Sequence, residues 1–314
     1  MKKKAIIISI RGSKLTSKER LILSKEKPWG VILFKRNIKT LTQIKYLIRK
    51  IKKISNNKNF PILIDEEGST VTRLGNIISH NISANYFGNL YHVNNKLCIK
   101  LYKEYLVSLC KNLRNIGINI NTIPVLDILR ANTSKVIGNR SFSSKKEIVK
   151  KLGQITVEEC HNNNIATVIK HIPGHGCTTF DSHLKMPKVN LTKGHLNKND
   201  FFPFKKSAAK MAMTAHILYK KIDRNNVATF SKKIIKEIIR KKIGYKGIIM
   251  SDDISMKALK YDLITNAKKS LEAGCNLVLY CAGNINDNFK LIKSLPYIDK
   301  FTAKKTSEIY KILR

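Results

Sequence analysis

Eight short, mostly β-branched apolar runs recur along this chain, and each is separated from the next by a polar or amphipathic stretch. Runs apolar on both faces are typical of strands in a parallel sheet whose crossover connections are helices. Eight such units within 314 residues predict an α/β fold, a single (β/α)8 barrel of the TIM type, because doubly wound sheets usually contain fewer strands. The runs are residues 5–10, 30–34, 61–64, 118–126, 166–169, 211–216, 247–250 and 276–279.

The stretches between these runs carry helical patterns, and a further pattern follows the last run. Ser231 and Gly244 are plausible start and stop signals for one of them. Neither a Pro/Gly/Ser-rich linker nor an internal repeat interrupts the alternation, so we expect one barrel domain over residues 1–314. The expected helices are 41–54, 96–115, 145–161, 204–209, 232–242, 263–273, 287–294 and 303–313.

The chain is strongly basic, with 60 Lys and Arg against 21 Asp and Glu and a formal net charge of +39. An apolar fraction of 43% excludes a largely disordered chain. The excess is mostly Lys, is spread over every segment, and accompanies many Asn and Ile residues, as in residues 51–59. Two interpretations stay open: codon drift in an AT-rich genome, or a surface selected to bind polyanions.

Targeting signals and cysteine spacing indicate the compartment. The apolar run after the first lysines is shorter than a signal peptide requires, and no run approaches the length of a membrane span. The 6 cysteines form no CxxC pair and no metal-binding spacing, which is typical of buried thiols in a reducing compartment. We therefore expect a cytoplasmic protein without a membrane span.

Polar side chains follow five of the eight runs, at the positions where the strands would end. In barrels of this type, catalytic residues lie at the carboxyl ends of the strands. Five polar strand ends in succession therefore predict an enzyme more strongly than a binding module. They are Asp65-Glu66-Glu67, Asp127, Lys170-His171, His216 and Ser251-Asp252-Asp253.

Two segments concentrate the chemistry. Residues 170–183 hold three His, one Lys and one Asp in a Gly/Pro-bearing loop, where the backbone can turn sharply and side chains can approach a ligand. Residues 247–256 form an apolar strand that delivers Asp252 at its carboxyl end. A carboxylate in that place can attack an electrophilic carbon or hold a metal ion.

With these motifs, the chain resembles the bacterial β-N-acetylglucosaminidases of glycoside hydrolase family 3 that act in cell-wall recycling, usually called β-hexosaminidases. The resemblance covers nearly the whole chain, and its most specific parts are the two segments above. The matching segments are residues 30–37, 64–68, 124–127, 137–142, 170–183, 214–216 and 251–256.

The resemblance implies a retaining exo-β-N-acetylglucosaminidase that removes terminal β-linked GlcNAc from peptidoglycan fragments such as GlcNAc-anhydro-muropeptides. It assigns Asp252 as the nucleophile that forms a covalent glycosyl-enzyme, His183 as the general acid/base, and Asp181 as the partner of His183. Retaining glycosidases normally pair two carboxylates. An imidazole with an unperturbed pKa near 6.5 can replace the second one, because a nearby carboxylate orients the ring and stabilises its charged form.

The resemblance also implies substrate-binding residues, with no metal and no cofactor. The partner would be a GlcNAc-containing oligosaccharide or muropeptide, and nucleic acid is not expected. After the shared Gly68, Ser69 and Thr70 stand where the family usually has Gly-Arg, which affects the loop beside the sugar. The implied sugar contacts are Asp65, Arg73, Arg140, Lys170 and His171.

Several residues near the expected site have simpler interpretations. We expect Asp127 and Asp253 to serve in loop hydrogen bonding, His175 and His216 in packing or support, and Cys177 as a small filler. Three alternative functions stay open. One is a metal-dependent hydrolase using His171, His216, Asp252 and Lys170. Another is an inactive basic protein that binds polyanions, and the third is a family 3 enzyme with another β-linked sugar or with phosphate as acceptor.

Overall fold

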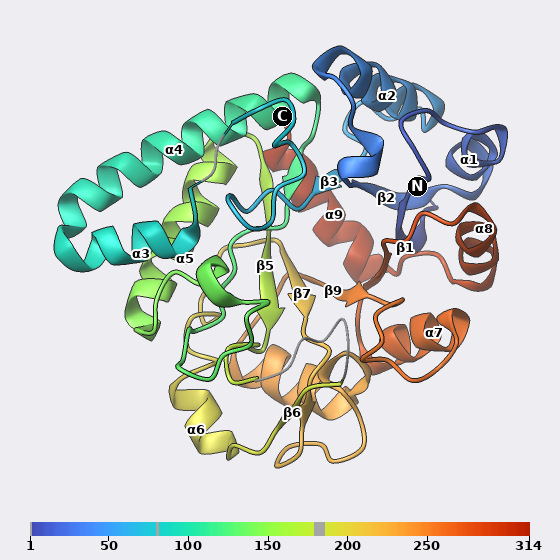
Figure 1. Cartoon of the computed structure of the whole chain (residues 1–314). Coiled ribbons are helices and arrows are strands. Elements are labelled where there is room, and N and C mark those ends of the chain that lie inside the picture. The colour runs from blue at the N-terminus through green and yellow to red at the C-terminus, as the bar shows by residue number, and fades with distance from the viewer. Residues whose placement is uncertain (1, 80–81, 179–185) are drawn as a thin grey trace.

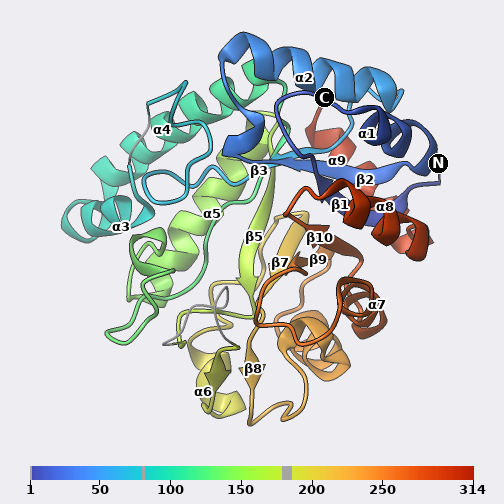
Figure 2. The ribbon, with the colours of Figure 1, turned by 45° about the vertical axis from the view of Figure 1, so that its right-hand side comes forward.

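A computed structural model describes residues 2–79, 82–178 and 186–314, and in it eight parallel strands close into a barrel (Figures 1 and 2). Each strand lies within, or overlaps, one of the eight apolar runs, so the predicted (β/α)8 barrel is confirmed. The barrel strands are β1 (Lys4–Ser9), β2 (Pro28–Leu33), β3 (Ile62–Ile64), β4 (Ile120–Asn121), β5 (Ala166–Ile172), β7 (Met211–Thr214), β9 (Ile248–Asp253) and β10 (Leu277–Tyr280).

The strands pair in sequence order around the barrel, and the circle closes where β1 pairs with β10, with Ile6 opposite Val278. β4 is shorter than its apolar run because Pro124 has no backbone N–H to donate to a neighbouring strand. The ladder resumes beyond it through a bridge between Val125 and Lys170. All eight carboxyl ends therefore meet at one end of the barrel.

Seven of the eight expected helices are present, and one of them, η5, is a π-helix. The side chain of Ser231 accepts a hydrogen bond from the Ile234 amide at 3.0 Å, and Gly244 has a positive φ of 77°, as expected of start and stop signals. These helices are α2 (Leu41–Ile54), α4 (Asn95–Ile116), α5 (Lys146–Asn162), η5 (Ile234–Lys242), α7 (Leu263–Ala273), α8 (Ile285–Ser294) and α9 (Lys300–Ile312).

The helix expected at 204–209 was a wrong prediction, because this segment forms turns. Lys206 adopts a left-handed φ of 60°, which a right-handed helix excludes, while Phe204 and Ala209 are buried. Further elements precede and follow the main helices: α1 (Ser17–Leu21), η1 (Ile22–Glu26), η2 (Lys35–Asn37), α3 (Ala84–Val93), η3 (Gly138–Arg140), α6 (Lys193–Lys198) and η4 (Ala228–Phe230). A small two-stranded sheet joins β6 (Lys188–Val189) to β8 (Leu218–Tyr219).

The core has two layers, as the alternation of strand side chains requires. On β1, Ile7 points into the barrel, whereas Ile6 and Ile8 pack between the barrel and its helices. At the amino-terminal end of the strands, the Trp29 indole N–H donates to the Thr306 hydroxyl of α9 at 2.8 Å, and α9 covers that end. A site for ligands is therefore left at the opposite, carboxyl end.

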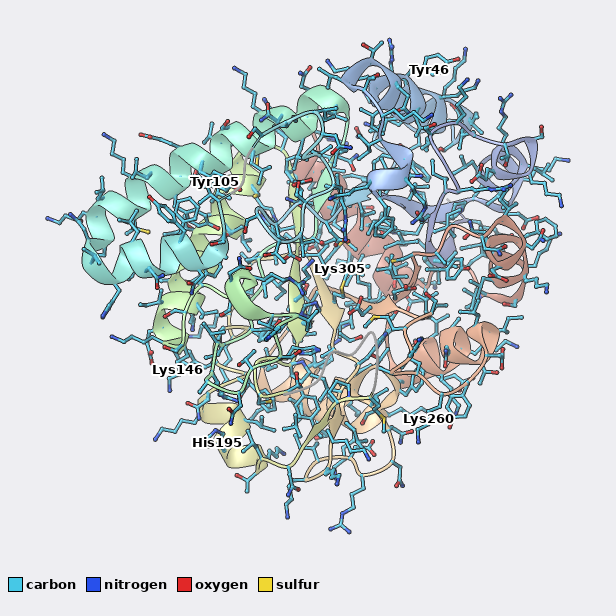
Figure 3. All side chains as sticks on the ribbon, in the orientation of Figure 1. Tyr46, Tyr105, Lys146, His195, Lys260 and Lys305 are labelled. Carbon is cyan, nitrogen blue, oxygen red and sulfur yellow. The ribbon has the colours of Figure 1, made fainter. Side chains whose placement is uncertain are left out.

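The basic side chains are distributed around the molecule. Figure 3 shows nitrogen-tipped side chains along the whole outline, with Lys146 on one side and Lys260 on another. Among the residues that the structure describes, no helix combines the length and the apolar character needed to cross a bilayer.

Candidate active site

A cavity of about 370 Å³ opens at the carboxyl ends of the barrel strands. Six predicted site residues line it, from the segment after β3, from η3 and from the ends of β5 and β9: Asp65, Arg73, Arg140, Lys170, His171 and Asp252. The remaining two, Asp181 and His183, lie outside the described residues. Its other lining residues are Phe34, Glu67, Thr70, Val71, Val136, Ile137, His175, Met213, Asp253, Leu279 and Cys281.

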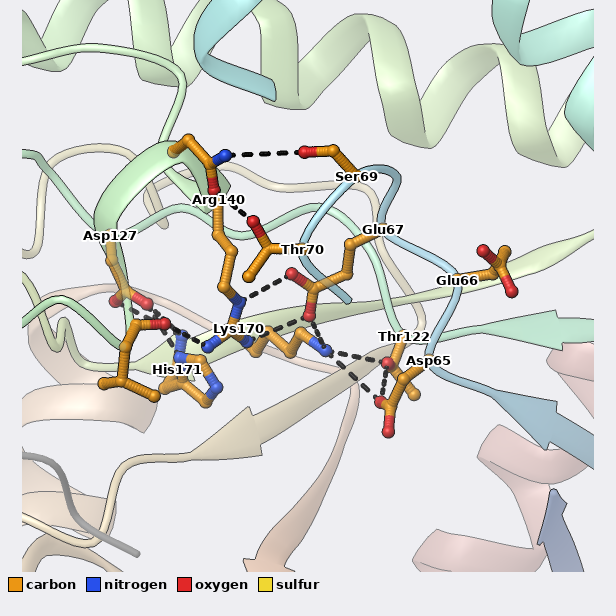
Figure 4. A network of polar contacts seen from close by, with 12 residues as sticks. Asp65, Glu66, Glu67, Ser69, Thr70, Thr122, Asp127, Arg140, Lys170 and His171 are labelled. Atoms are coloured by element: carbon orange, nitrogen blue, oxygen red, sulfur yellow. Dashed lines mark hydrogen bonds and ion pairs between the residues drawn. The ribbon is translucent and has the colours of Figure 1, made fainter. Parts of the chain in front are cut away.

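Lys170 lies between two carboxylates at the bottom of a polar network (Figure 4). Its ammonium Nζ is 2.5 Å from Glu67 Oε1 and 3.3 Å from Asp65 Oδ1, and it donates to the Thr122 hydroxyl at 2.8 Å. Only 3% of the Lys170 side chain is exposed. A buried ammonium needs such partners, because an isolated buried charge is very costly.

Asp65 also forms an ion pair with Arg73, whose Nη2 lies 3.1 Å from Asp65 Oδ2. Burial by itself would raise the pKa of Asp65, but the charges of Lys170 and Arg73 and the hydrogen bond from Thr122 hold it well below its usual range. The carboxylate is thus ionised and can only accept hydrogen bonds. The Arg73 guanidinium also stacks 5.2 Å from the centre of the Phe34 ring.

Arg140 and Glu67 form a two-pronged ion pair, with Nε to Oε2 at 2.7 Å and Nη2 to Oε1 at 2.9 Å. Burial opposes the charge of Glu67, but Arg140 and Lys170 outweigh it and lower its pKa to about 2. Burial likewise opposes the charge of Arg140, but Glu67 raises the Arg140 pKa above its ordinary value. Sequence reasoning placed Glu67 only among polar strand ends and missed its part in the site. Its position two residues after Asp65, on the same loop, was the available signal.

Ser69 and Thr70, the two residues that depart from the family motif, connect two loops at the cavity rim. The Thr70 hydroxyl bonds Asn139 Oδ1 at 2.5 Å, and Asn139 Nδ2 donates to the Ser69 hydroxyl at 3.4 Å. Asn139 directly precedes Arg140 in η3, so the loop after β3 is tied to η3 at the rim as well as through Glu67 (Figure 4).

His171 enters the cavity wall from the end of β5 and is held from behind by Asp127. The ring Nδ1 lies 2.7 Å from Asp127 Oδ2, and the His175 amide donates to Asp127 Oδ1 at 2.6 Å. Asp127 is thus a buried hydrogen-bond acceptor, in line with the expected structural role. His175 lies beside His171. Burial is the main cause that lowers the pKa of His175 to about 4, and the neighbouring His171 ring is the second.

Asp252 and Asp253 end β9, and their surroundings differ. Asp253 accepts from the Ser255 amide at 3.1 Å, the Ser255 hydroxyl at 2.6 Å and the Cys281 amide at 3.1 Å, so it organises the adjoining turn. Burial raises its pKa, and the neighbouring Asp252 charge adds to this. Asp252 accepts from the Asp253 amide at 2.7 Å and lines the cavity.

His216 is engaged on both ring nitrogens, with the Thr229 hydroxyl at 2.7 Å and the Asp253 carbonyl at 3.0 Å. This agrees with a supporting role. The metal-dependent alternative needs His171 and His216 as ligands, yet both ring nitrogens of His216 already have protein partners. Within residues 2–79, 82–178 and 186–314, no three His, Cys, Asp or Glu side chains come together as metal ligands would.

The family model for the glycosyl hydrolase family 3 N-terminal domain matches residues 2–306. Beta-hexosaminidases from Nitrosomonas eutropha and Haemophilus influenzae are each 31% identical to the chain. Their matches cover 97% and 93% of the chain and 87% and 85% of those proteins, respectively.

Among solved structures, native NagZ from Neisseria gonorrhoeae superposes with a TM-score of 0.90 at 28% identity, covering 98% of this chain and 90% of that one. A family 3 β-N-acetylglucosaminidase from Paenibacillus superposes with a TM-score of 0.86 at 26% identity, covering 98% of this chain and 60% of that one. Since these matches span nearly its whole length, the chain belongs to glycosyl hydrolase family 3 and is a glycoside hydrolase.

Proposed function

We propose that this protein is a retaining exo-β-N-acetylglucosaminidase acting on peptidoglycan fragments, with residues 1–314 as one catalytic barrel domain. Relatives named beta-hexosaminidase support a glycoside hydrolase that releases GlcNAc. The observation that carries the proposal is the convergence of six predicted residues, from segments as distant as Asp65 and Asp252, on one cavity. The cytoplasmic location stays a prediction.

The polar network is suited to hold a terminal sugar. Asp65 is ionised and is fixed from below by Lys170 and Thr122, so its remaining lone pairs can accept from sugar hydroxyls. Arg73, with 25% of its side chain exposed, can donate to hydroxyl oxygens. Such preorganised donors and acceptors spare the substrate the cost of ordering them.

The cavity supports exo action because it is closed from below. Met213 and Leu279, from β7 and β10, line it, and the barrel beneath is filled by apolar side chains. A chain end can enter such a site, whereas an internal sugar would need a groove open at both ends. The site thus favours a terminal residue.

In the proposed reaction, a carboxylate oxygen of Asp252 attacks the anomeric carbon as the bond from that carbon to the leaving oxygen breaks. His183, oriented by Asp181, gives its proton to the leaving oxygen. Water then attacks the anomeric carbon of the glycosyl-enzyme and passes a proton to His183, and Asp252 is released. Two inversions give net retention.

The direct test is release of 4-nitrophenol from 4-nitrophenyl β-N-acetylglucosaminide, compared with the β-glucoside. We expect cleavage of the first and little of the second. Activity confined to the glucoside would show that the enzyme prefers glucose to the proposed GlcNAc. No activity on either substrate would refute the proposed function. Adding phosphate and identifying the sugar product separates hydrolysis, which yields GlcNAc, from phosphorolysis, which yields its 1-phosphate.

A further inference from the structure

Asp127, in the segment after β4, is a buried carboxylate. It binds both the His171 ring at the end of β5 and the backbone of the loop that follows β5. Its oxygens accept from His171 Nδ1 at 2.7 Å and from the His175 amide at 2.6 Å, and the His171 amide lies 3.3 Å from each of them. None of its side chain is exposed. It thus stands behind the cavity wall and acts on the cavity through His171.

The protonation of this pair follows from its surroundings. Burial by itself would raise the pKa of Asp127, but the His171 ring and the amide of His175 outweigh it, so the pKa is lowered. An ionised carboxylate only accepts, so the hydrogen between the two side chains belongs to His171 Nδ1. The other ring nitrogen, Nε2, then points away from Asp127, as Figure 4 shows.

We propose that Asp127 is a positioning residue that holds the hydrogen of His171 on Nδ1, so that Nε2 accepts a hydrogen bond from a substrate hydroxyl. The inference rests on the proposed sugar site. Arg73, which also lines the cavity, can only donate hydrogen bonds. The cavity therefore offers a donor in Arg73 and an acceptor in His171 Nε2, which suits a hydroxyl group that both accepts and donates.

Asp127→Asn is the informative variant, because the amide keeps the shape but has only one accepting atom. The His175 amide is a fixed donor and requires the carbonyl oxygen of the new side chain. The amide NH2 then faces His171 Nδ1 and requires an acceptor there. The imidazole can satisfy this by moving its hydrogen to Nε2, which turns Nε2 from an acceptor into a donor.

Asp200→Asn is the matched control. Asp200 is also a buried carboxylate, pairs with Arg130 at 2.7 Å, and packs against Gly174 of the same loop. The structure gives it no hydrogen bond to His171. It therefore reports the cost of neutralising a buried carboxylate beside this loop without changing the partner of the ring.

The experiment measures ¹⁵N NMR of the histidine rings, with His171 assigned from a His171→Gln variant, together with kcat, KM and melting temperature. We expect Nδ1–H in the wild type and in Asp200→Asn, and Nε2–H in Asp127→Asn. The kcat/KM for 4-nitrophenyl β-N-acetylglucosaminide should fall roughly 10–100-fold in Asp127→Asn, by analogy with carboxylates that orient metal-binding histidines, and stay near the wild-type value in Asp200→Asn.

Three results would overturn the inference. One is a wild-type His171 ring that carries a hydrogen on Nε2, a measurement that does not depend on the folding of any variant. Another is an unchanged kcat/KM in a folded Asp127→Asn protein. The third is a loss of activity in both variants in proportion to their melting temperatures, with the His171 tautomer unchanged. If the wild type releases no nitrophenol, the proposed function fails, and the tautomer measurement still tests the pairing separately.

Discussion

Both carboxylate oxygens of Glu67 are bonded by the guanidinium of Arg140, at 2.7 and 2.9 Å, and one of them is also 2.5 Å from Lys170. Glu67 follows β3, whereas Arg140 lies in η3, 73 residues further along the chain. The pair thus joins two loops that form the cavity wall. Removing the carboxylate leaves the buried Arg140 guanidinium without its ion-pair partner and leaves Lys170 paired with Asp65 alone.

Glu67→Gln should therefore destabilise the fold by about 3–5 kcal/mol near neutral pH, as measured by urea unfolding. Glu147→Gln is the control, because Glu147 is 66% exposed and its contact with Lys146 is 3.8 Å long. We expect the control to change stability by less than about 1 kcal/mol. Equal effects of the two substitutions would show that the buried pair adds nothing.

The loss of stability caused by Glu67→Gln should depend on pH. The Glu67 pKa is lowered from 4.5 to about 2 in the folded protein, so its stabilisation is fully present above pH 4.5 and is lost as pH falls toward 2. The stability difference between wild type and Glu67→Gln should therefore shrink on acidification. Urea titrations at a series of pH values between these limits measure it. A constant difference would mean that Glu67 is not ionised in the native state.

Asp252→Ala should abolish turnover, because the variant has no atom to form the glycosyl-enzyme. In the wild type, a slowly turned-over fluorosugar should label Asp252, which mass spectrometry of peptides would locate. Asp253 offers a neighbouring comparison, since its carboxylate already accepts three hydrogen bonds. A label found on Asp253 or Asp65 would refute the assignment.

His183→Ala should slow the cleavage of substrates with poor leaving groups far more than the cleavage of substrates that release 4-nitrophenol. General acid catalysis contributes roughly 10²–10⁴-fold, and a good leaving group needs little protonation. The measurement compares kcat/KM for a GlcNAc disaccharide and for the nitrophenyl glycoside. A similar loss on both substrates would exclude His183 as the general acid.

Salt dependence separates codon drift from a selected basic surface. Because screening acts on exposed charge, kcat/KM for a neutral disaccharide should hardly change between about 20 and about 300 mM salt. For a muropeptide that carries carboxylates, kcat/KM should fall modestly at the higher salt concentration, because screening weakens the electrostatic attraction that steers the substrate to the protein. Binding of DNA or anionic wall fragments that falls steeply with salt would instead support a selected surface. A steep effect on the neutral sugar would mean that the charge reaches the cavity, and would overturn the drift interpretation.

The barrel could be predicted because its strands are buried on both faces, so they stand out as apolar runs. The helix α2 was predicted at its observed limits, Leu41–Ile54, because its apolar residues repeat on one face. In contrast, α3 was missed. Its segment contains Gly88, where an added Cβ would lie 1.6 Å from the Phe142 carbonyl oxygen, so tertiary packing explains the glycine there.

The charged residues of the site were predictable because polar side chains at the ends of apolar strands are conspicuous. Apolar lining residues such as Val136 and Met213 were not, because one sequence does not distinguish them from core residues. The partners within the network also escaped prediction. Glu67 and Thr122 join Lys170 only through the register that the barrel imposes on β3, β4 and β5.

The ion-pair network around Lys170 is drawn entirely from one continuous stretch, from Asp65 to Lys170, whereas Asp252 comes from a strand more than eighty residues later. In the proposed mechanism, the residues that bind the sugar and the nucleophile are thus encoded in separate parts of the gene. Recombination with a relative at breakpoints before β3 and after β5 would transfer the whole network intact and retain the recipient's own nucleophile. New substrate preferences could arise in this family by exchange of a single block.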